Sequence, residues 1–438
     1  MKFLLNISLL LLTVSQAVFA QEKKAWTLDD CLTYATENNI TIKASEFDKQ
    51  SAEVTYTQSK YSRFPSLSAS AQQNMNNGTS IDPITSNFVT QMVHSTSLGV
   101  TAQVTLYNGN YINNTIKQNE LLIRQNEFFV SEAKNSIILS VTQAYLQALY
   151  YNEGITVAEN AVASSQEQVN QANTKFKAGS LAGIEVANLQ TQLSNDQYSV
   201  VTAKNNYRQQ LITLKQLLEL EPGAEFEIAT PELPDSKIII PDLQQVYQTA
   251  VAGMPEVKSA KLQTDIATFD LKKAKAGYLP TLSLYAGLNT GYTNTQSYNF
   301  STQLDNNFYQ TAGLSLSVPI FSKYQNKGAV EQARITIEQS KLTEKSTSKQ
   351  LYLKIESAWQ NAVSVQSEMQ AAEALQASSK MAYEMAQKKS ELGSLSATDL
   401  LVSKNTYQTA QQQYLQTKFS SALYYQLLQF YQGNAIKI

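Results

Sequence analysis

Apolar side chains recur at alternating steps of four and three residues through the stretch from about Tyr111 to Lys177. Such a seven-residue period is typical of helices that pack lengthwise, because it keeps one apolar seam facing a neighbour. The same steps return 214 residues later. The pattern predicts two helices of about 67 residues, each roughly 100 Å long. The two seams are Ile137, Val141, Ala144, Ala148, Tyr151, Ile155 and Ala158, and Leu351, Ile355, Ala358, Ala362, Val365, Met369 and Ala372.

Proline and glycine mark where these helices can run and where they end. None of the nine prolines lies between residues 84 and 221 or after residue 319, and a proline inside a helix costs about 3 kcal/mol. Each long helix is followed by a Gly-Ser-Leu turn and a returning helix, at about 183–220 and 397–432. We expect the glycine to end the long helix in a left-handed conformation and the serine to begin capping the returning helix. The two tips are Gly179, Ser180 and Leu181, and Gly393, Ser394 and Leu395.

Two segments in each half alternate between apolar and polar residues, as where Leu67, Ala69 and Ala71 are separated by serines. This period of two predicts β-hairpins over residues 64–107 and 280–320, each strand with one apolar face. The pattern fits transmembrane barrel strands around a wet interior, with an ordinary half-buried sheet as the alternative. Polar loops at about 74–95 and 290–310 are expected between the strands, and helices at 28–62 and 243–275 before them.

The chain is an internal duplication. Residues 28–68 align without a gap on residues 243–283, and residues 99–217 align on 313–431. A repeat of this length is a duplicated supersecondary unit. We therefore divide the chain into a first repeat, 21–220, a proline-containing connector, 221–242, and a second repeat, 243–438. The connector is predicted to be ordered, because it contains the apolar run Ile238-Ile239-Ile240.

The first 20 residues have the features of a cleaved secretory signal: a lysine at the start, an apolar stretch, and small residues before Gln21. After Gln21 no apolar run reaches the roughly 18 residues that a membrane-spanning helix needs. A membrane role would therefore use β-strands or an amphipathic surface. Cys31 is the only cysteine, and its apolar-periodic surroundings favour a small buried residue over a reactive thiol.

Charge and chemistry point away from catalysis. The formal net charge is −2, which does not favour a nucleic acid partner. His94 is the only histidine, so a histidine-based acid–base site or metal site is disfavoured. No phosphate-binding or dinucleotide-binding glycine pattern is present. We predict a protein that is not an enzyme and has no cofactor or metal.

Four strands cannot close a membrane barrel, because an open edge in lipid leaves backbone groups unpaired. Three chains would pool 12 strands. The fold class that follows is membrane α+β: a trimeric 12-stranded β-barrel continued by a long α-helical coiled-coil barrel, with four strands from each protomer. A periplasmic coiled-coil protein of structural or adhesive function, without channel activity, is the alternative.

Several short motifs occur in a characteristic order. They are Thr27-Leu28-Asp29-Asp30, the helix-to-strand prolines Pro65 and Pro280, Val318-Pro319-Ile320-Phe321, and the two Gly-Ser-Leu tips. In this order the chain resembles the TolC-type outer membrane efflux proteins of Gram-negative bacteria. The resemblance implies a homotrimeric channel in outer membrane lipid, with a tunnel extending into the periplasm. It also implies a periplasmic adaptor and an inner-membrane transporter as partners, with drugs, small molecules or proteins as cargo.

The resemblance also assigns roles to residues near the tips. It implies that the adaptor docks on the tips, and that Asp399 lines a constriction of the pore, with Glu185 as its repeat partner. The alternative is that both acids complement the positive N-terminal ends of their helices. The chain departs from the family pattern at Val402, where a second carboxylate is often found, and at Leu395, where a basic residue sometimes stands.

Overall fold

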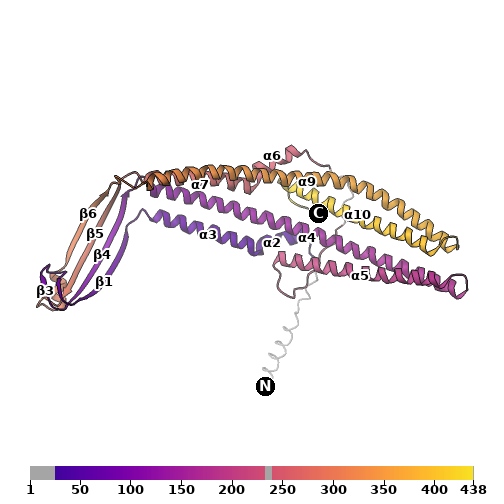
Figure 1. Cartoon of the computed structure of the whole chain (residues 1–438), viewed down its shortest axis with the longest axis horizontal. Helices are drawn as coiled ribbons and strands as arrows, with labels where there is room; N and C mark the ends of the chain where they lie inside the picture. The colour runs from indigo at the N-terminus through magenta and orange to yellow at the C-terminus, as the bar shows by residue number, and fades with distance from the viewer. Residues whose placement is uncertain (1–24, 232–238, 438) are drawn as a thin grey trace, which may run out of the picture. The chain divides into compact units, whose positions relative to one another are not determined.

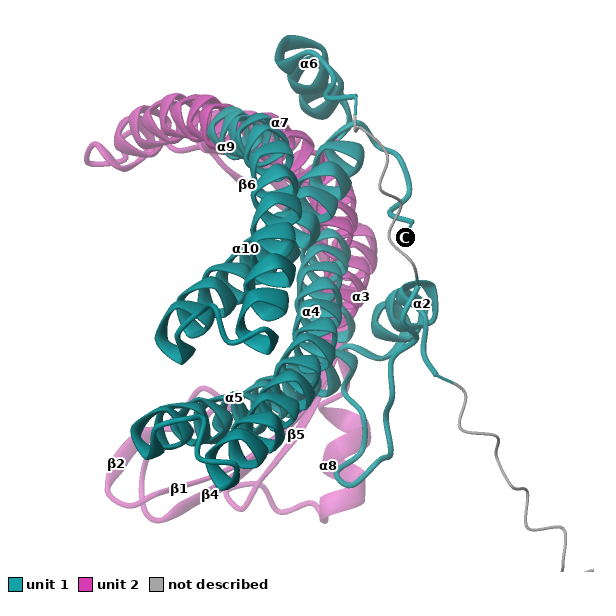
Figure 2. Ribbon diagram, turned by 90° about the vertical axis from the view of Figure 1, so that its right-hand side faces the viewer, with its two compact units in different colours: residues 1–43, 133–253, 351–438 teal, residues 44–132, 254–350 magenta. Residues whose placement is uncertain are grey.

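The computed structural model describes residues 25–231 and 239–437 (Figure 1). The chain forms two compact units, shown in Figure 2. Unit 1 contains residues 1–43, 133–253 and 351–438, and unit 2 contains residues 44–132 and 254–350. Both repeats contribute to both units. The predicted secretory signal, residues 1–20, lies outside the described residues.

The long helices have the predicted extents. Helix α4 spans Tyr111–Lys177 and helix α9 spans Gln325–Glu391, 67 residues each. The returning helices are α5, Gly183–Leu218, and α10, Ala397–Tyr431. The first four residues of the first seam, at 137, 141, 144 and 148, are buried, and the last three are half-buried. All residues of the second seam except Met369 are buried. The seven-residue period therefore identified the packed face of each helix.

The helices that precede the strands are each broken in two, where the sequence predicted one. In the first repeat, α2 spans Leu28–Asn38 and α3 spans Ile40–Tyr61. Asn39 between them is extended, with φ −61° and ψ 131°. Its side-chain amide donates to the Leu217 carbonyl at 3.0 Å, and its oxygen accepts from the Thr41 amide at 2.9 Å. Asn39 keeps the backbone bonds that end α2 and begin α3, to the Ala35 carbonyl and from the Lys43 amide, and its side chain caps the start of α3.

The second break has a local cause. Helix α6 spans Leu243–Gly253 and α7 spans Pro255–Ala276. Met254 is extended, because the ring of a following proline disfavours the helical conformation of the residue before it. Pro255 is itself well placed as the first residue of α7, where its missing N–H costs no hydrogen bond.

The strands form one four-stranded antiparallel sheet in unit 2, in the order β1-β4-β5-β6. They span Ser66–Asn76 (β1), Val93–Tyr107 (β4), Thr281–Thr293 (β5) and Tyr309–Ser317 (β6). The register aligns Val100 with Ala69 and with Leu288, so the apolar positions of neighbouring strands share one face. The β4–β5 pairing joins the two repeats. Within the described residues, β1 and β6 each have one unpaired edge.

The predicted polar loops contain additional elements. Strands β2, Thr79–Ile81, and β3, Phe88–Thr90, pair with each other, and helix α8 spans Phe300–Asn306. Asp82 follows β2 and is fully buried. Its carboxylate accepts from the Ile84 and Thr85 amides at 2.9 and 3.0 Å, and from the hydroxyls of Thr293, at 2.8 Å, and Thr295. Burial acts to raise the pKa of Asp82, but these hydrogen bonds hold it below the ordinary value.

The connector contacts the start of the first repeat. Trp26 forms a parallel β-bridge with Ile228. The Trp26 amide donates to the Glu227 carbonyl, and the Trp26 carbonyl accepts from the Ala229 amide, both at 2.8 Å. The Tyr145 hydroxyl donates to the Ala229 carbonyl at 2.8 Å. Residues 232–238, which include Ile238 of the apolar run, lie outside the described residues.

The core of unit 1 surrounds the connector bridge. Cys31 has 0% exposure in this core, and burial raises the pKa of its thiol to about 12. The thiol is therefore protonated and shielded at neutral pH, as the apolar-periodic pattern indicated.

No helix within the described ranges has the length and apolar character needed to cross a membrane.

Candidate functional site at the helical tips

The two tips of unit 1 have the same backbone. Gly179 and Gly393 are left-handed, with φ of 75° and 74°. In the first tip the Gly179 amide donates to the Phe176 carbonyl at 2.9 Å, and the Ser180 amide donates to the Lys175 carbonyl at 3.0 Å. The second tip repeats both bonds at positions 214 residues later. This pair of bonds is the Schellman motif, which satisfies the last carbonyls of a helix.

The tip serines cap the preceding helix, where the sequence predicted capping of the returning helix. The Ser180 hydroxyl donates to the Lys175 carbonyl and the Ser394 hydroxyl to the Lys389 carbonyl, both at 3.0 Å. The returning helix α10 is instead capped by Ser396, whose hydroxyl accepts from the Asp399 amide at 3.1 Å. Each tip serine therefore closes the turn from the side of the long helix.

Lys175 links the two tips. Its ammonium group donates to the carbonyls of Ser390, at 2.7 Å, and Glu391, at 3.2 Å, at the C-terminal end of α9. A cation is favourable there because unpaired carbonyls give that end of a helix partial negative charge. The matching residue of the second repeat, Lys389, is exposed.

The helices behind the tips enclose an ion pair. Lys404 of α10 and Asp196 of α5 are 1% and 5% exposed, and the Lys404 nitrogen lies 2.6 Å from an Asp196 carboxylate oxygen. The ammonium group also donates to the Ser165 hydroxyl and, at 3.2 Å, to the Ala161 carbonyl on α4. Burial lowers the pKa of Lys404, and Asp196 opposes that shift. The pair therefore joins α10 to both α4 and α5.

A second buried polar group lies closer to the tips. The Tyr383 hydroxyl of α9 bonds the Ser164 hydroxyl at 2.7 Å and accepts from the side-chain amide of Gln168 at 2.8 Å. Burial raises the pKa of Tyr383. The Gln168 carbonyl oxygen is buried and has no hydrogen-bond partner among the described residues. A cavity of about 600 Å³ lies between the tips and is lined by Gln168, Lys175, Glu185 and the second turn.

The predicted site residues are in part brought together. The six tip residues lie along one end of unit 1, and Glu185 lies in the same cavity wall. Asp399 is exposed in the first turn of α10 and accepts a hydrogen bond from the Ser396 hydroxyl at 2.8 Å. This bond supports the helix-end interpretation of Asp399. Its role at a pore constriction stays a prediction.

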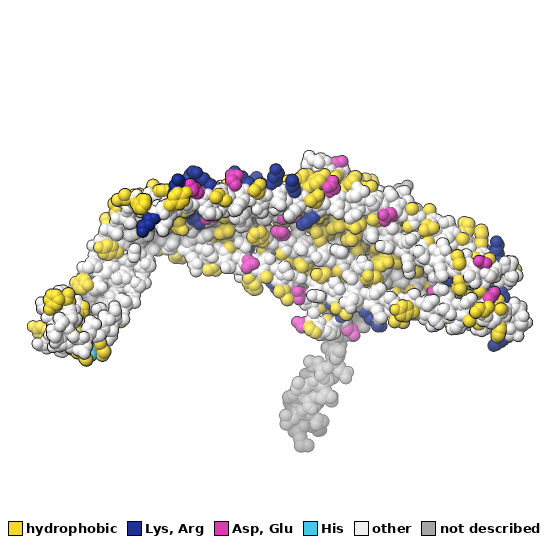
Figure 3. Space-filling view, in the orientation of Figure 1, with side chains coloured by type: hydrophobic (Ala, Val, Ile, Leu, Met, Phe, Trp, Pro, Cys, Tyr) yellow, Lys and Arg dark blue, Asp and Glu magenta, His cyan; other side chains and the backbone are white. Residues whose placement is uncertain are grey.

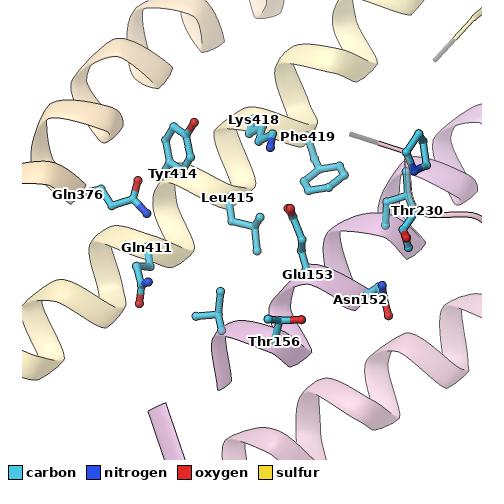
Figure 4. Close-up of a pocket in the computed structure, with 13 residues that line it drawn as sticks. Asn152, Glu153, Thr156, Thr230, Gln376, Gln411, Tyr414, Leu415, Lys418 and Phe419 are labelled. Atoms are coloured by element: carbon cyan, nitrogen blue, oxygen red, sulfur yellow. The ribbon is translucent and has the colours of Figure 1, made fainter. Parts of the chain in front are cut away.

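A larger cavity, of about 740 Å³, lies further along the helices of unit 1 (Figure 4). Glu153 of α4 is directed toward Leu415 and Phe419 of α10, and Gln411 and Tyr414 line the α10 side. No group of three or more His, Cys, Asp or Glu side chains that could hold a metal occurs in residues 25–231 and 239–437.

Sequence reasoning missed the Lys404–Asp196 pair. A comparison of the repeats contains the signal, because Lys404 aligns with Gln190 and Asp196 aligns with Ala410. At each of these two matched positions one repeat carries a charged residue and the other a neutral one, and the two charges have opposite signs. The hypothesis considered only the Glu185 and Asp399 pair, where both repeats carry an acid.

Comparison with known proteins gives the family. A family model described as "Outer membrane efflux protein" matches residues 32–219 and 246–432, one segment in each repeat. The chain is 28% identical over 221 residues to the alkaline protease secretion protein AprF of Pseudomonas aeruginosa, a match that covers 49% of this chain and 44% of AprF. It is 22% identical over 331 residues to the outer membrane protein TolC of Vibrio cholerae, covering 75% and 72%. The AprF match thus spans less than half of that relative.

Solved structures show the same fold at low identity. The CmeC outer membrane channel of Campylobacter jejuni superposes with a TM-score of 0.80 at 19% identity, over 93% of this chain and 85% of that chain. The outer membrane protein VceC of Vibrio cholerae gives a TM-score of 0.77 at 13% identity, over 94% and 97%. These likenesses concern the fold alone.

Proposed function

Because the chain belongs to the outer membrane efflux protein family, we propose that it forms an outer membrane channel for export, working with a periplasmic adaptor and an inner-membrane transporter. The cargo passes through the channel without being chemically changed, which agrees with a family of efflux channels. The names of AprF and TolC refer to secretion and to the outer membrane. The alternative, a periplasmic coiled-coil protein without channel activity, has no comparable support.

The observation that carries the proposal is the four-stranded sheet, whose outer strands β1 and β6 each have one edge without a partner in the described part of the chain. In lipid, every backbone N–H and C=O must be bonded within the protein, so β1 and β6 need partner strands. Joining β6 of one copy to β1 of the next closes the edges in a cyclic assembly. Three copies give a 12-stranded barrel, within the range known for membrane barrels.

The helices supply the tunnel of the same assembly. Each copy contributes two helical hairpins from its two repeats, so a trimer has six similar hairpins around its axis. The exposed Lys389 then has a partner in the next copy. Just as Lys175 bonds the C-terminal end of α9 within one copy, Lys389 bonds the C-terminal end of α4 of the next copy. The tips at Gly179 and Gly393 form the periplasmic end, where the adaptor docks.

The channel is tested by conductance. The purified protein is expected to extract from membranes only with detergent, to run as a trimer until heated, and to give discrete conductance steps in a planar bilayer. A heated sample is the matched control and gives no steps. A monomer that is soluble without detergent and gives no steps would favour the coiled-coil alternative.

Adaptor docking is tested with single cysteines at Ser180 or Ser394 and a thiol-reactive crosslinker in intact cells. Cys31 gives little background, because it is buried and its thiol pKa is raised to about 12. A cysteine at the exposed Ser346 of α9, away from the tips, is the control. Recovery of an adaptor from the tip positions and not from residue 346 supports docking. Equal recovery from all three positions would contradict it.

A further inference from the structure

The four strands of unit 2 meet their helices at one end of the sheet. The register pairs Ser66 at the start of β1 with Gln103 near the end of β4. It pairs Tyr107 at the end of β4 with Leu282, and Thr281 at the start of β5 with Ser317 at the end of β6. The four helix–strand junctions therefore lie side by side, at one level of the sheet.

These junctions carry an excess of positive charge. In residues 56–64, 107–119, 269–280 and 318–331 the acidic residues are Asp270, which is paired with Lys273 at 2.9 Å, and Glu331, whose carboxylate lies 3.9 Å from the Lys327 ammonium group. The other basic residues are exposed. In the view of Figure 3, dark blue side chains gather along α7 and the beginning of α9, with a few magenta side chains among them. We call the following residues the basic collar: Lys60, Arg63, Lys117, Lys272, Lys273, Lys275, Lys323 and Lys327.

Exposed aromatic side chains accompany the basic collar. Phe321, Tyr61 and Tyr324 are 83%, 66% and 58% exposed. The ammonium groups of two collar residues, Lys272 and Lys327, lie 4.2 Å and 5.2 Å from the ring centroids of Phe269 and Tyr324. Aromatic rings concentrate where a membrane meets water, because one part of the side chain is apolar and another is polarisable or polar.

The backbone gives an independent reason to regard these side chains as functional. In the first repeat the turn from β4 into α4 has two left-handed residues, Gly109 and Asn110, with φ of 64° and 65°. The second repeat keeps the same conformation with Lys323 and Tyr324, at φ 48° and 71°. Glycine and asparagine adopt this conformation with little strain, whereas lysine and tyrosine do so at a cost. Strain that the fold retains at a surface position is associated with a functional demand on the side chain.

We propose that the basic collar binds the anionic headgroups of phospholipids at the periplasmic face of the outer membrane, an inference that rests on the proposed membrane channel. The sheet occupies the apolar layer, and the junctions at its helical end lie at the level of the headgroups. A surface on which basic side chains outnumber carboxylates attracts lipid phosphates that carry net negative charge, and the attraction weakens within a screening length of the membrane surface. The aromatic rings fix the depth of the collar, and the lysines select the charge of the lipid.

The test is native mass spectrometry of the detergent-purified assembly, with equal amounts of anionic phosphatidylglycerol and zwitterionic phosphatidylethanolamine added. The wild type is expected to retain phosphatidylglycerol preferentially, and less so as salt is raised. The variant K272Q/K275Q/K323Q/K327Q is expected to lose this preference by roughly tenfold, because several surface cations act together on one anionic surface.

The matched control removes the same charge from the same unit. K258Q/K261Q/K345Q/K349Q changes four exposed lysines of α7 and α9 that lie away from the junctions, and it is expected to retain the wild-type preference. Equal binding of both lipids by the wild type, or an equal loss in both variants, would overturn the inference. Conductance in a zwitterionic bilayer is measured on the same samples. If the wild type conducts but has no lipid preference, the inference fails and the channel stands, whereas a wild type that does not conduct removes the proposed function itself.

Discussion

Removal of the Lys404 ammonium group should be among the most destabilising single changes in unit 1. The group is 1% exposed and donates to three acceptors, Asp196, Ser165 and the Ala161 carbonyl. In K404M the Asp196 carboxylate stays buried, with only the Ser165 hydroxyl and the side-chain amides of Gln192 and Gln408 as donors. Leaving one charge of a buried pair without its partner costs about 3–5 kcal/mol of the free energy of unfolding.

The double variant K404M/D196L separates the ion pair from packing. Because no buried charge remains in it, we expect its unfolding free energy to return to within about 1–2 kcal/mol of the wild type. The two single losses should therefore be strongly non-additive in a double-mutant cycle. The measurement is urea unfolding of the purified protein in detergent, followed by the helical circular dichroism signal.

An exposed ion pair of the same unit is the control. Lys204 and Glu159 lie 2.7 Å apart, with side chains 44% and 52% exposed. Solvent screens such a pair, so K204M should cost less than about 1 kcal/mol. Equal effects of K404M and K204M, or additive effects of K404M and D196L, would refute the assignment of a coupled buried pair.

Three further predictions concern other parts of the chain. G393A should destabilise the tip by about 1–2 kcal/mol in thermal unfolding, because the backbone φ of 74° strains any residue with a Cβ, although no atom lies within 4 Å of the added Cβ. The control is G154A in α4, where the added Cβ also meets no atom within 4 Å; it should stabilise the protein by about 1 kcal/mol. A loss of stability in both variants would contradict the backbone explanation. Three copies of Asp399 at a pore constriction would favour cations, so D399N should lower the cation selectivity of the channel in bilayers more than the exposed E384Q does. An unchanged reversal potential would remove Asp399 from the pore. The folded pKa of Asp82 is lowered from 3.8, so its contribution to loop stability is complete above that pH and is lost as the pH falls through the folded value. Hydrogen-exchange protection of residues 79–90, relative to the intrinsic rate at each pH, should therefore fall in acid in the wild type and change less in D82N.

Much of the molecule follows from local patterns in the sequence. A seam with a period of 3.5 predicts a packed helix, and alternation with a period of two predicts a strand. The extents of α4 and α9 and the positions of the four main strands could therefore be derived, while the strands themselves run a few residues into the predicted loops. The duplication adds that both halves share one plan. Gly179 and Gly393 mark the tips for the same reason, because a left-handed residue is a local requirement.

The tertiary structure decided what depends on partners distant in the sequence. At the break between α2 and α3, the Asn39 side chain bonds the Leu217 carbonyl. The loop around Asp82 is held by a hydrogen bond from Thr293 of the other repeat. Lys404 and Asp196 are 208 residues apart, and each taken alone is an ordinary charged residue on a polar helix. The sequence determined the elements because their periodicities are local, whereas the buried pair behind the tips exists only once the helices that carry it are packed together.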